Sequence, residues 1–558
     1  MEYRHSYRGP ARNVGRRSWR MARAPGLVVA LLVAVCVSFV VSASSGAAAN
    51  RPSSPSSQAW SNEAGIEHLH FRTAPIKVLP GQNSIQMVPI PRNEKPAVDG
   101  YIVRMRPDVQ YLDGEVPPVN VIHLHHGVWS DARHGPFFFG GEEKTVFHIP
   151  RGYGYPYKAS DRWTLDQMIH NQRPVPTRVR LVWNLDFIPA STSLARTVKP
   201  VIPVWLDVRG GEDYPVFNSA SGSGERGAFT YPTDAKNPYG GHTPLNEVRV
   251  PFDGTIVGAV GHIHPGGLYD TIELVRPGAA LPTGRACRRE AVDITDSRSA
   301  TRCVAATPGS TAHSVRIFRA QAHYYEPAGP VSWDFALTAS RPDWRVRVRR
   351  GDTLRITTTY ASNHISWYEN MGIALLFVAP GDRSGVDPFS AAVDWRGVLT
   401  HGHLGENNVH GGAPTSIVDV RKLLNGPLTT EVRIKGYTYR PGDLSLLGQP
   451  GARVPTVRQG HSLLFVNQDH AGYEWHTITA CRVPCNRSTG IAFPLSNAPA
   501  ATQFDSGQLG IDPMQMGPHS SPATNTMRWR TPSNLPPGTY TYYCRVHPFM
   551  RGAFRVVR

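Results

Sequence analysis

The last stretch of the chain carries three side chains that could bind one transition metal. Cys544, His547 and Met550 follow one another at the spacing C-x2-H-x2-M. A thiolate and two imidazoles, with a thioether as weak fourth ligand, bind copper in both of its oxidation states. The missing imidazole must come from a distant strand, and His476 stands in an apolar, alternating run. These residue types predict a blue, electron-transferring copper site.

The ligand loop closely resembles that of amicyanin and of its pseudoazurin and plastocyanin relatives. Arg551 and Gly552 follow the loop and lead into an alternating strand, 553–557. The resemblance covers 430–558 and implies a cupredoxin Greek-key β-sandwich with one type 1 copper. The interval between His476 and Cys544 is longer than in the small cupredoxins. A sandwich that has lost its metal is the alternative.

Histidines also gather in the middle of the chain. In the strand-like run V-I-H-L-H-H-G-V-W, His123 and His125 would share one face while His126 points away. Two adjacent histidines can serve one metal only where the strand bends, and Gly127 offers that bend. His170 ends a second apolar stretch. A lone histidine is weak evidence for a metal site.

Further along the chain, His262 and His264 stand two residues apart on one expected strand. They would lie on one face, which suits a metal platform. Met371 begins an apolar strand, where a methionine taken alone is more often core than ligand. His401 and His403 repeat the H-x-H spacing. They are a rival for either mid-chain site, although an exposed turn there needs no metal.

Taken in order, His-His, His, H-x-H and Met resemble the copper type II monooxygenases, the family of peptidylglycine alpha-hydroxylating and dopamine beta-monooxygenases. The resemblance covers 63–425 and implies two facing β-sandwich domains, 63–207 and 208–425. It also implies a small-molecule substrate, bound between the sandwiches in a cleft open to water. The implied ligands are His125, His126 and His170 for an electron-storing copper, and His262, His264 and Met371, the catalytic candidates, for the copper where dioxygen reacts.

Two positions depart from the peptide-amidating enzymes of this family. Those enzymes have an Arg two residues before the H-x-H pair and a Tyr four residues after the Met, and both hold the substrate carboxylate. Val260 and Leu375 stand there instead, so peptide amidation is not expected. Arg545, not a histidine, follows Cys544. This disfavours multicopper oxidases and copper nitrite reductases, in which a Cys-His pair connects the coppers.

The composition indicates a mostly β, multidomain chain. Its 558 residues include 52 Gly and 49 Pro, with many short alternating runs and no long amphipathic helix. Together with the resemblances, this predicts an all-β fold of two tandem β-sandwich domains followed by the cupredoxin sandwich. The formal net charge is +17, but seven Arg against one Glu lie in the first 25 residues. We expect no nucleic-acid partner, although a basic surface could attract an acidic redox partner.

The N-terminal segment 1–49 has an Arg-rich start, an apolar run over 26–41 and small residues up to Ala49. This pattern predicts an export signal cleaved near Ala49 or, if uncleaved, a membrane-anchor helix with its basic end inside. A Ser- and Pro-rich linker, 50–62, follows. We expect an extracytoplasmic location in the cell envelope.

Export makes disulfides plausible for two local cysteine pairs, Cys287 with Cys303 and Cys481 with Cys485. Free buried thiols are the alternative. Cys36 lies in the leader, and Cys544 is reserved as a copper ligand.

Two functional hypotheses remain. In the first, the chain is an exported copper oxidoreductase whose blue-copper domain is a built-in electron relay, at high local concentration because it is covalently attached. A redox partner protein or a small reductant would supply the electrons. In the second, the chain is a non-catalytic electron-transfer protein whose middle sandwiches are a scaffold or a copper store. Val260 and Leu375 favour the second, because they remove known substrate contacts. Three coppers per chain would support the first hypothesis and one the second.

Overall fold

A computed structural model describes residues 60, 63–79, 85–119, 121–173, 175–210, 215–279, 304–306, 312–325, 334–363, 365–402, 404, 418–469, 475–481, 502–510, 526–545, 547 and 549–558. Almost all of the secondary-structure elements in these residues are strands, so the predicted all-β class is confirmed. The predicted leader lies outside the described residues. None of the helices within them is long and apolar enough to cross a membrane.

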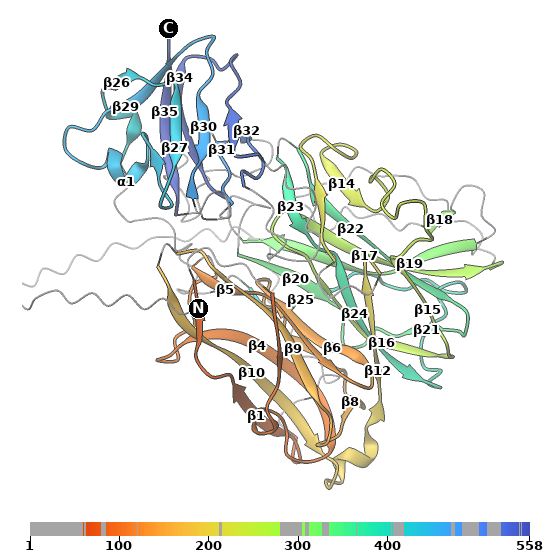
Figure 1. Ribbon diagram of the computed structural model, residues 1–558. Helices are drawn as coiled ribbons and strands as arrows, with labels where there is room; N and C mark the ends of the chain where they lie inside the picture. Colours follow the sequence, from red (N-terminus) through yellow and green to blue (C-terminus); the bar gives the residue numbers. More distant parts are fainter. Residues whose placement is uncertain are drawn as a thin grey trace, which may run out of the picture. The chain divides into compact units, whose positions relative to one another are not determined.

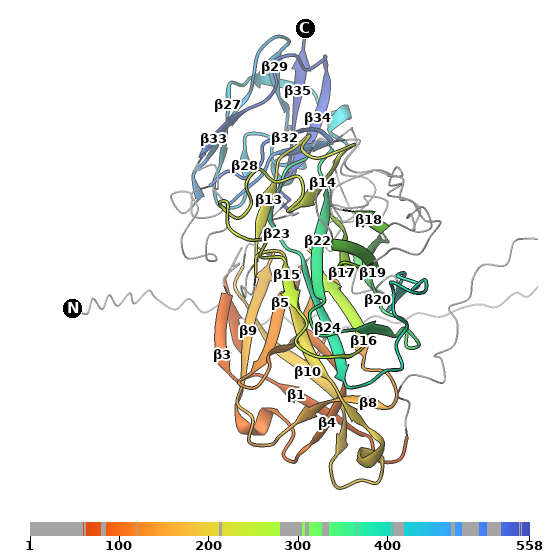
Figure 2. The same ribbon diagram turned by 90° about the vertical axis from the view of Figure 1, so that its right-hand side faces the viewer.

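The first sandwich has a seven-stranded and a four-stranded sheet (Figure 1). The larger sheet runs β1-β10-β4-β8-β11, with β2 beside β10 and β7 beside β4, and the smaller runs β3-β9-β5-β6 (Figure 2). Met105 and Trp183 from the larger sheet share one buried core with Trp129 and Leu165 from the smaller. The elements are β1 (Glu67–Arg72), β2 (Ile76–Val78), β3 (Ile85–Pro89), η1 (Arg92–Glu94), β4 (Gly100–Tyr111), β5 (Ile122–Asp131), β6 (Gly135–Gly141), β7 (Phe147–His148), β8 (Tyr153–Tyr157), β9 (Trp163–Asn171), β10 (Thr177–Pro189), η2 (Leu194–Thr197) and β11 (Lys199–Pro200).

The second sandwich has a four-stranded sheet, β12-β24-β16-β21, and an eight-stranded sheet, β14-β22-β17-β19-β20-β25 with β15 and β18 attached. A two-stranded sheet, β13-β23, completes it. The strands are β12 (Ile202–Asp207), β13 (Phe217–Ser219), β14 (Ala228–Tyr231), β15 (Glu247–Arg249), β16 (Gly254–His262), β17 (Gly267–Pro277), β18 (Val304–Ala306), β19 (Ala312–Tyr324), β20 (Phe335–Ala339), β21 (Val346–Val348), β22 (Thr353–Ala361), β23 (Trp367–Asn370), β24 (Ile373–Pro380) and β25 (Val398–Leu399).

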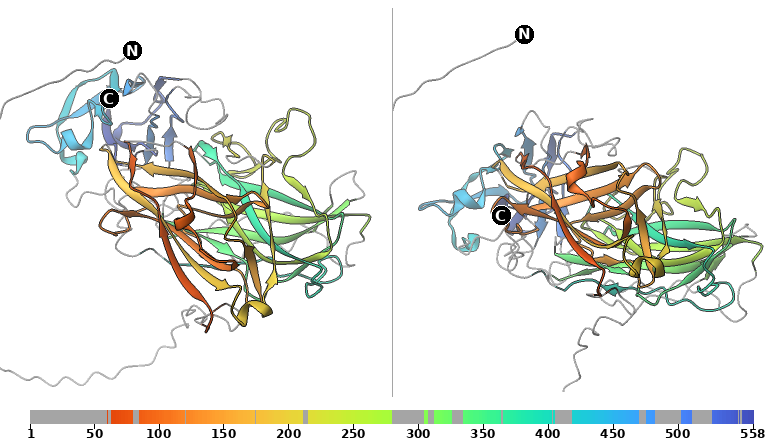
Figure 3. Two further views of the ribbon diagram at one scale, coloured as in Figure 1. Left: turned by 60° about the horizontal axis from the view of Figure 1, so that its bottom comes forward. Right: turned by 90° about the horizontal axis from the view of Figure 1, so that it is seen from below.

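The third sandwich, blue in Figure 3, has a six-stranded sheet, β26-β29-β35-β34-β31-β32, and a four-stranded sheet, β28-β27-β30-β33. Phe465 from the smaller sheet and Phe554 from the larger lie in one core. The elements are η5 (Val420–Lys422), β26 (Asn425–Leu428), β27 (Glu431–Ile434), β28 (Tyr439–Arg440), α1 (Leu444–Leu447), β29 (Val454–Arg458), β30 (Leu464–Asn467), β31 (Thr479–Cys481), β32 (Thr502–Asp505), β33 (Arg528–Arg530), β34 (Gly538–Tyr543) and β35 (Arg551–Val557).

The four-stranded sheet of the second sandwich is buried on both faces. Along β24, Ala374 and Leu376 belong to the core of the second sandwich, while Leu375 and Phe377 belong to the core of the first. This alternation follows from the two-residue period of a strand. β12, which ends at Asp207, pairs with β24. The first two sandwiches therefore share a hydrophobic core, and the domain boundary at 207 stays a prediction.

Candidate metal centres

The C-terminal ligand loop closes a hairpin. β34 and β35 pair antiparallel up to Tyr543 opposite Arg551, so residues 544–550 form the connection. The backbone N–H of Cys544 donates to the Met550 carbonyl at 3.0 Å, and that of Met550 donates to the His547 carbonyl at 2.8 Å. These bonds hold the three predicted ligand residues in one compact loop, where all three are buried.

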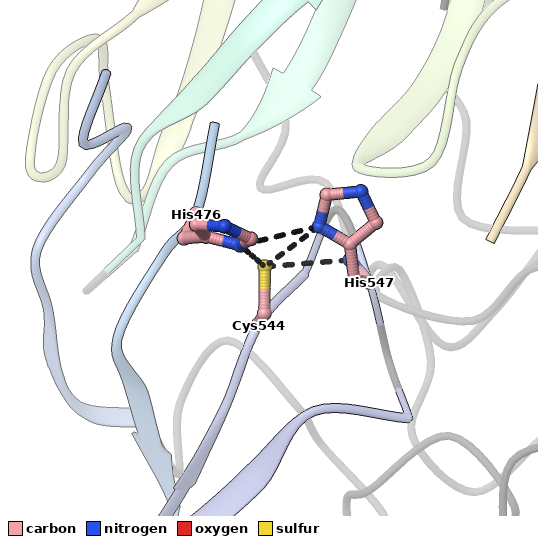
Figure 4. A group of neighbouring side chains, drawn as sticks. All are labelled: His476, Cys544 and His547. Atoms are coloured by element: carbon pink, nitrogen blue, oxygen red, sulfur yellow. Dashed lines mark hydrogen bonds between the residues drawn. The ribbon is translucent and has the colours of Figure 1, made fainter. Parts of the chain in front are cut away.

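His476 lies beside this loop because β31, which follows it, pairs with β34. Its Nδ1 is 3.9 Å from Cys544 Sγ and 3.3 Å from His547 Nδ1, and Sγ is 3.8 Å from His547 Nδ1 (Figure 4). Nitrogen and sulfur ligands at ~2.0–2.3 Å from one metal lie roughly 3.3–3.9 Å apart. The three atoms therefore fit the first shell of one metal ion.

The sulfur of Cys544 is held by two backbone N–H groups. Thr477 and His547 both donate to Sγ at 3.3 Å. Burial raises the pKa of Cys544, but His476 outweighs it and the pKa lies below the ordinary value. Burial likewise opposes the charge on His476, yet the Asp469 carboxylate and the Cys544 sulfur raise its pKa to about 9. The pair thus favours a thiolate, the form that binds metal.

Asp469 fixes the orientation of the His476 ring. Its Oδ2 lies 2.9 Å from His476 Nε2 and accepts that N–H, so Nδ1 is the ring nitrogen that faces the sulfur. The same carboxylate accepts backbone N–H groups from Gly436 and Tyr437. The Tyr437 ring also packs edge-on against His476 at 5.8 Å and His547 at 5.1 Å between centroids. A ligand held in this way needs little rearrangement to bind metal.

In the middle of the chain, the strand irregularity lies two positions before the residue that the sequence suggested. The register of β5 against β9 shifts between Leu124 and His126, which makes His125 the extra residue of a bulge. Gly127, the expected bend, pairs regularly with Gly140 and Gln167. The bulge rotates His125 relative to a regular strand, and this brings more histidines together than alternation allows.

Four histidines of the first sandwich form one buried group. The ring centroids of His123 and His170 are 5.3 Å apart, and each lies 5.8 Å from that of His125. His126 stacks parallel to His125 at 6.4 Å. His123 donates from Nδ1 to the Val119 carbonyl, which leaves its lone pair on Nε2. His123, which the resemblance did not select, therefore lies as close to the group as His170 does.

His262 and His264 of the second sandwich join the same group. The His264 ring stacks on that of His125 at 4.0 Å and lies 5.1 Å from that of His262. His264 Nδ1 bonds to the Glu369 carbonyl at 2.7 Å, and His262 Nδ1 bonds to Glu143 Oε2 at 3.0 Å. Both Nε2 atoms are buried and form no hydrogen bond with any described residue. These imidazoles present an unused nitrogen to the interior, as a metal ligand does.

Met371 is tied to His264 through one hydroxyl group. Tyr360 Oη accepts backbone N–H groups from His264 at 2.9 Å and Met371 at 3.0 Å, and it donates to the Met371 carbonyl at 2.8 Å. The Met371 side chain is fully buried in the core of the first sandwich. The sequence divided these histidines between two separate coppers, whereas the structure places both sets in one contiguous interior cluster.

Two consecutive carboxylates complete the cluster. Glu142 and Glu143 occupy the centre of a turn closed by the backbone bond from Lys144 N to Gly141 O. Both side chains are fully buried. A Cβ on Gly141 would lie 2.6 Å from Glu143 Oε2 and from His262 Cε1, so only glycine lets the turn approach so closely. Sequence analysis missed both residues, because two glutamates after two glycines are typical of a surface turn.

Burial keeps most of these imidazoles neutral. It lowers the pKa of His125 and of His170 to about 3, aided in each case by a neighbouring histidine. Burial also raises the pKa of Glu142 well above its ordinary value. Only His262, beside the Glu143 carboxylate, has a raised pKa, although burial opposes its charge. Neutral imidazoles carry the lone pair that metal binding requires.

The water-exposed cleft between the sandwiches stays a prediction. Every predicted mid-chain ligand is buried. Val260 and Leu375, which replace the substrate-holding side chains of the amidating enzymes, pair in register and lie in the core of the first sandwich. That sheet face packs against another sandwich, so these two positions could not hold a substrate carboxylate.

The His401 side chain contacts the backbone of the turn that carries Glu142 and Glu143. Its Nε2 lies 2.7 Å from the Glu143 carbonyl, and its Nδ1 lies 2.7 Å from that of Gly402. Both ring nitrogens thus face carbonyl oxygens, which does not favour a ligand role for His401. His403 lies outside the described residues, as do Cys287, Cys303 and Cys485, so neither predicted disulfide is tested.

The C-terminal ligand loop of the third sandwich lies close to the histidine cluster of the first. The ring centroids of His547 and His170 are 6.4 Å apart. Arg545 bonds to both oxygens of Asp505, at 3.2 and 3.1 Å, and its guanidinium lies 4.8 Å from the centroid of Trp367. The residue after Cys544 therefore anchors the loop against the second sandwich, while His547 faces the histidine cluster.

Comparison with known proteins adds little to this geometry. No family model and no curated protein matches the chain. Among solved structures it is similar to the Cu-containing nitrite reductase (NirK) from Thermus scotoductus SA-01, with 12% identity and a TM-score of 0.14. The match covers 55% of this chain and 59% of the reductase chain. A likeness this distant carries no argument, so function is argued from the two residue groups that could hold a metal.

Proposed function

We propose that the chain is an exported copper oxidoreductase whose C-terminal sandwich transfers electrons to a metal-binding histidine cluster in the middle sandwiches. The carrying observation is the group His476, Cys544 and His547, with Nδ1 and Sγ atoms 3.3 to 3.9 Å apart. Met550 closes the same loop and supplies a thioether. Copper bound to this set would supply a one-electron change with little rearrangement of its ligands.

The chain's own residues prepare this site before metal arrives. Thr477 and His547 donate N–H groups to the thiolate, and Asp469 holds the His476 ring. His547 Nε2 is buried and bonds to none of the described residues. That ring edge lies next to His170, so an electron that leaves through His547 would reach the first sandwich there. This route does not use the residue after the cysteine.

A second candidate is an electron carrier whose middle sandwiches only store metal. One observation favours it: the positions that hold substrate in the amidating enzymes, Val260 and Leu375, are core residues. Under this alternative the histidine cluster would bind metal but would accept no electrons.

Two measurements test the proposal. The copper-loaded protein should show the intense visible absorption of a Cu(II)–thiolate bond, and a colourless copper-loaded protein would refute the C-terminal assignment. Stopped-flow mixing of the fully reduced protein with oxygen then separates the candidates. If electrons pass to the middle, His262→Ala should slow the return of the blue colour. An unchanged rate would leave the chain an electron carrier. Export with cleavage would give a mature protein that begins near residue 50, whereas an uncleaved anchor would keep residues 1–49; mass spectrometry of the native protein would distinguish the two.

A further inference from the structure

One buried carboxylate in the histidine cluster lacks a hydrogen bond to any other described residue. Glu142 is fully buried, and neither of its oxygens forms a hydrogen bond with another described residue. His125 Nδ1 lies 3.3 Å from Glu142 Oε2. A carboxylate taken out of water in this way costs several kcal/mol unless a cation offsets it.

The contact between Glu142 and His125 has the geometry of two ligands and not of a donor and an acceptor. At 3.3 Å the atoms are close enough to bond, yet neither His125 Nδ1 nor Glu142 Oε2 is hydrogen-bonded. Two ligand atoms at ~2.0–2.2 Å from one tetrahedral metal ion are separated by roughly 3.3–3.6 Å. The lone pairs of these two groups can therefore converge on a common point.

His123 supplies a third ligand atom. Its ligand atom and those of His125 and Glu142 all lie within 4.8 Å of one another, and all three residues are buried. In the described part of the chain, His126 joins no such group of three. This geometry selects a different set from the one implied by the monooxygenase resemblance.

We propose that His123, His125 and Glu142 form a two-histidine, one-carboxylate site for a divalent first-row transition-metal ion. Imidazole and carboxylate together suit ions such as Fe²⁺, Zn²⁺ or Cu²⁺. A carboxylate is a hard ligand, whereas a thioether is a soft ligand that favours Cu(I). The ion would neutralise the buried charge of Glu142. The inference rests on the proposed function only in that the middle cluster binds metal; it does not depend on the C-terminal site.

The neighbouring carboxylate plays a positioning role. Glu143 holds His262 through Nδ1, and His264 is held through its own Nδ1 by the Glu369 carbonyl. The turn at Gly141 thus directs one carboxylate at the first-sandwich histidines and the other at the second sandwich. One short segment connects the metal site to the H-x-H pair.

Titration with Co²⁺, which reports its ligands through its visible spectrum, tests the proposal. The full-length protein would carry Cys544→Ser, so that the thiolate of the C-terminal site does not compete for the ion. Glu142→Gln and His123→Gln should each weaken mid-chain Co²⁺ binding by ~10-fold or more. His126→Gln, and the matched control Glu273→Gln, whose carboxylate pairs with Arg355, should leave binding within ~3-fold of the parent.

Thermal unfolding of the metal-free proteins separates a ligand from a structural residue. Glu142→Gln should melt at or above the temperature of the parent without metal, because it replaces a buried carboxyl group that forms no hydrogen bond with another described residue, and Co²⁺ should raise its melting temperature less. Equal Co²⁺ affinity in Glu142→Gln and its parent, or loss of binding in His126→Gln but not in His123→Gln, would overturn the ligand set. If the parent binds no mid-chain Co²⁺, this inference and the mid-chain part of the proposed function both fail. The visible absorption of the C-terminal copper in the wild-type protein would be unaffected.

Discussion

The C-terminal centre and the mid-chain cluster both gather potential metal ligands, but they draw them from the chain in different ways. Three C-terminal ligand residues, Cys544, His547 and Met550, lie in one hairpin loop, and His476 lies just before the neighbouring strand β31. The mid-chain cluster draws on β5, β6, β9 and β16, from two sandwiches. The spacing of residues in the sequence can reveal a site whose ligands lie in one loop. A site whose ligands come from several strands forms only when the sandwiches pack. The predictions below test this difference.

The largest expected effect is a double dissociation of metal content. Cys544→Ser should lose the C-terminal copper and its visible absorption entirely, because the thiolate is an obligatory ligand, and should keep the mid-chain metal. His125→Ala should do the reverse, because His125 belongs to the proposed mid-chain ligand set. Metal analysis of each purified variant, with its absorption spectrum, checks this. If either variant loses both metals, the centres are not independent.

Acid should weaken the first sandwich through His148. Burial, aided by the charge of Arg104 and opposed by Asp186, lowers the pKa of His148 to about 4. Between pH 6.5 and 4, His148 is therefore protonated in the unfolded chain but neutral in the folded chain. The free energy of unfolding decreases as pH falls through this range, and His148 causes no further loss below pH 4. The loss is on the order of 3 kcal/mol for this shift. Chemical denaturation near pH 7 and near pH 4 should show a smaller loss in His148→Gln, and an equal loss in both proteins would contradict the assignment.

A single methyl group should damage the dispersed site. In Gly141→Ala the new Cβ would meet Glu143 and His262 at 2.6 Å, so the turn must move. We expect a loss of roughly 1–3 kcal/mol in unfolding free energy and weaker mid-chain metal binding. Gly402→Ala is the control, because no atom lies within 4 Å of its added Cβ. Denaturant titration and metal analysis of both variants measure the difference, and similar behaviour of the two would argue against close packing at the turn.

The smallest expected effect concerns the connection between the centres. Arg545→Gln removes the contacts with Asp505 and Trp367 but no ligand. Contacts of this kind are worth roughly 1–2 kcal/mol. We expect an unchanged visible spectrum and an electron-transfer rate to the middle that falls by ~10-fold or less. Arg433→Gln, which breaks an exposed pair with Glu431, should leave the rate unchanged. A normal rate in Arg545→Gln would show that this anchor is not needed.

The limits of the sequence follow from the same contrast. Alternating runs predicted the all-β class, and the spacing of Cys544 and His547 predicted residues that the structure brings together. The bulge at His125 could not be predicted, because it depends on the register of β5 against β9. Glu142 carried no signal, because a buried carboxylate and an exposed one look alike in sequence. Its role follows only from the side chains packed around it.

The shared sheet also constrains how small molecules reach the cluster. Separation of the first two sandwiches would expose large side chains such as Leu375 and Phe377, at about 1.5–3 kcal/mol each. A hinge that opens and closes with every catalytic cycle is therefore disfavoured. Oxygen or a substrate would enter through brief local openings of side chains and loops, which need far less exposure. If the proposed oxidoreductase turns over a substrate in this cluster, entry and release of small molecules would then limit the turnover rate.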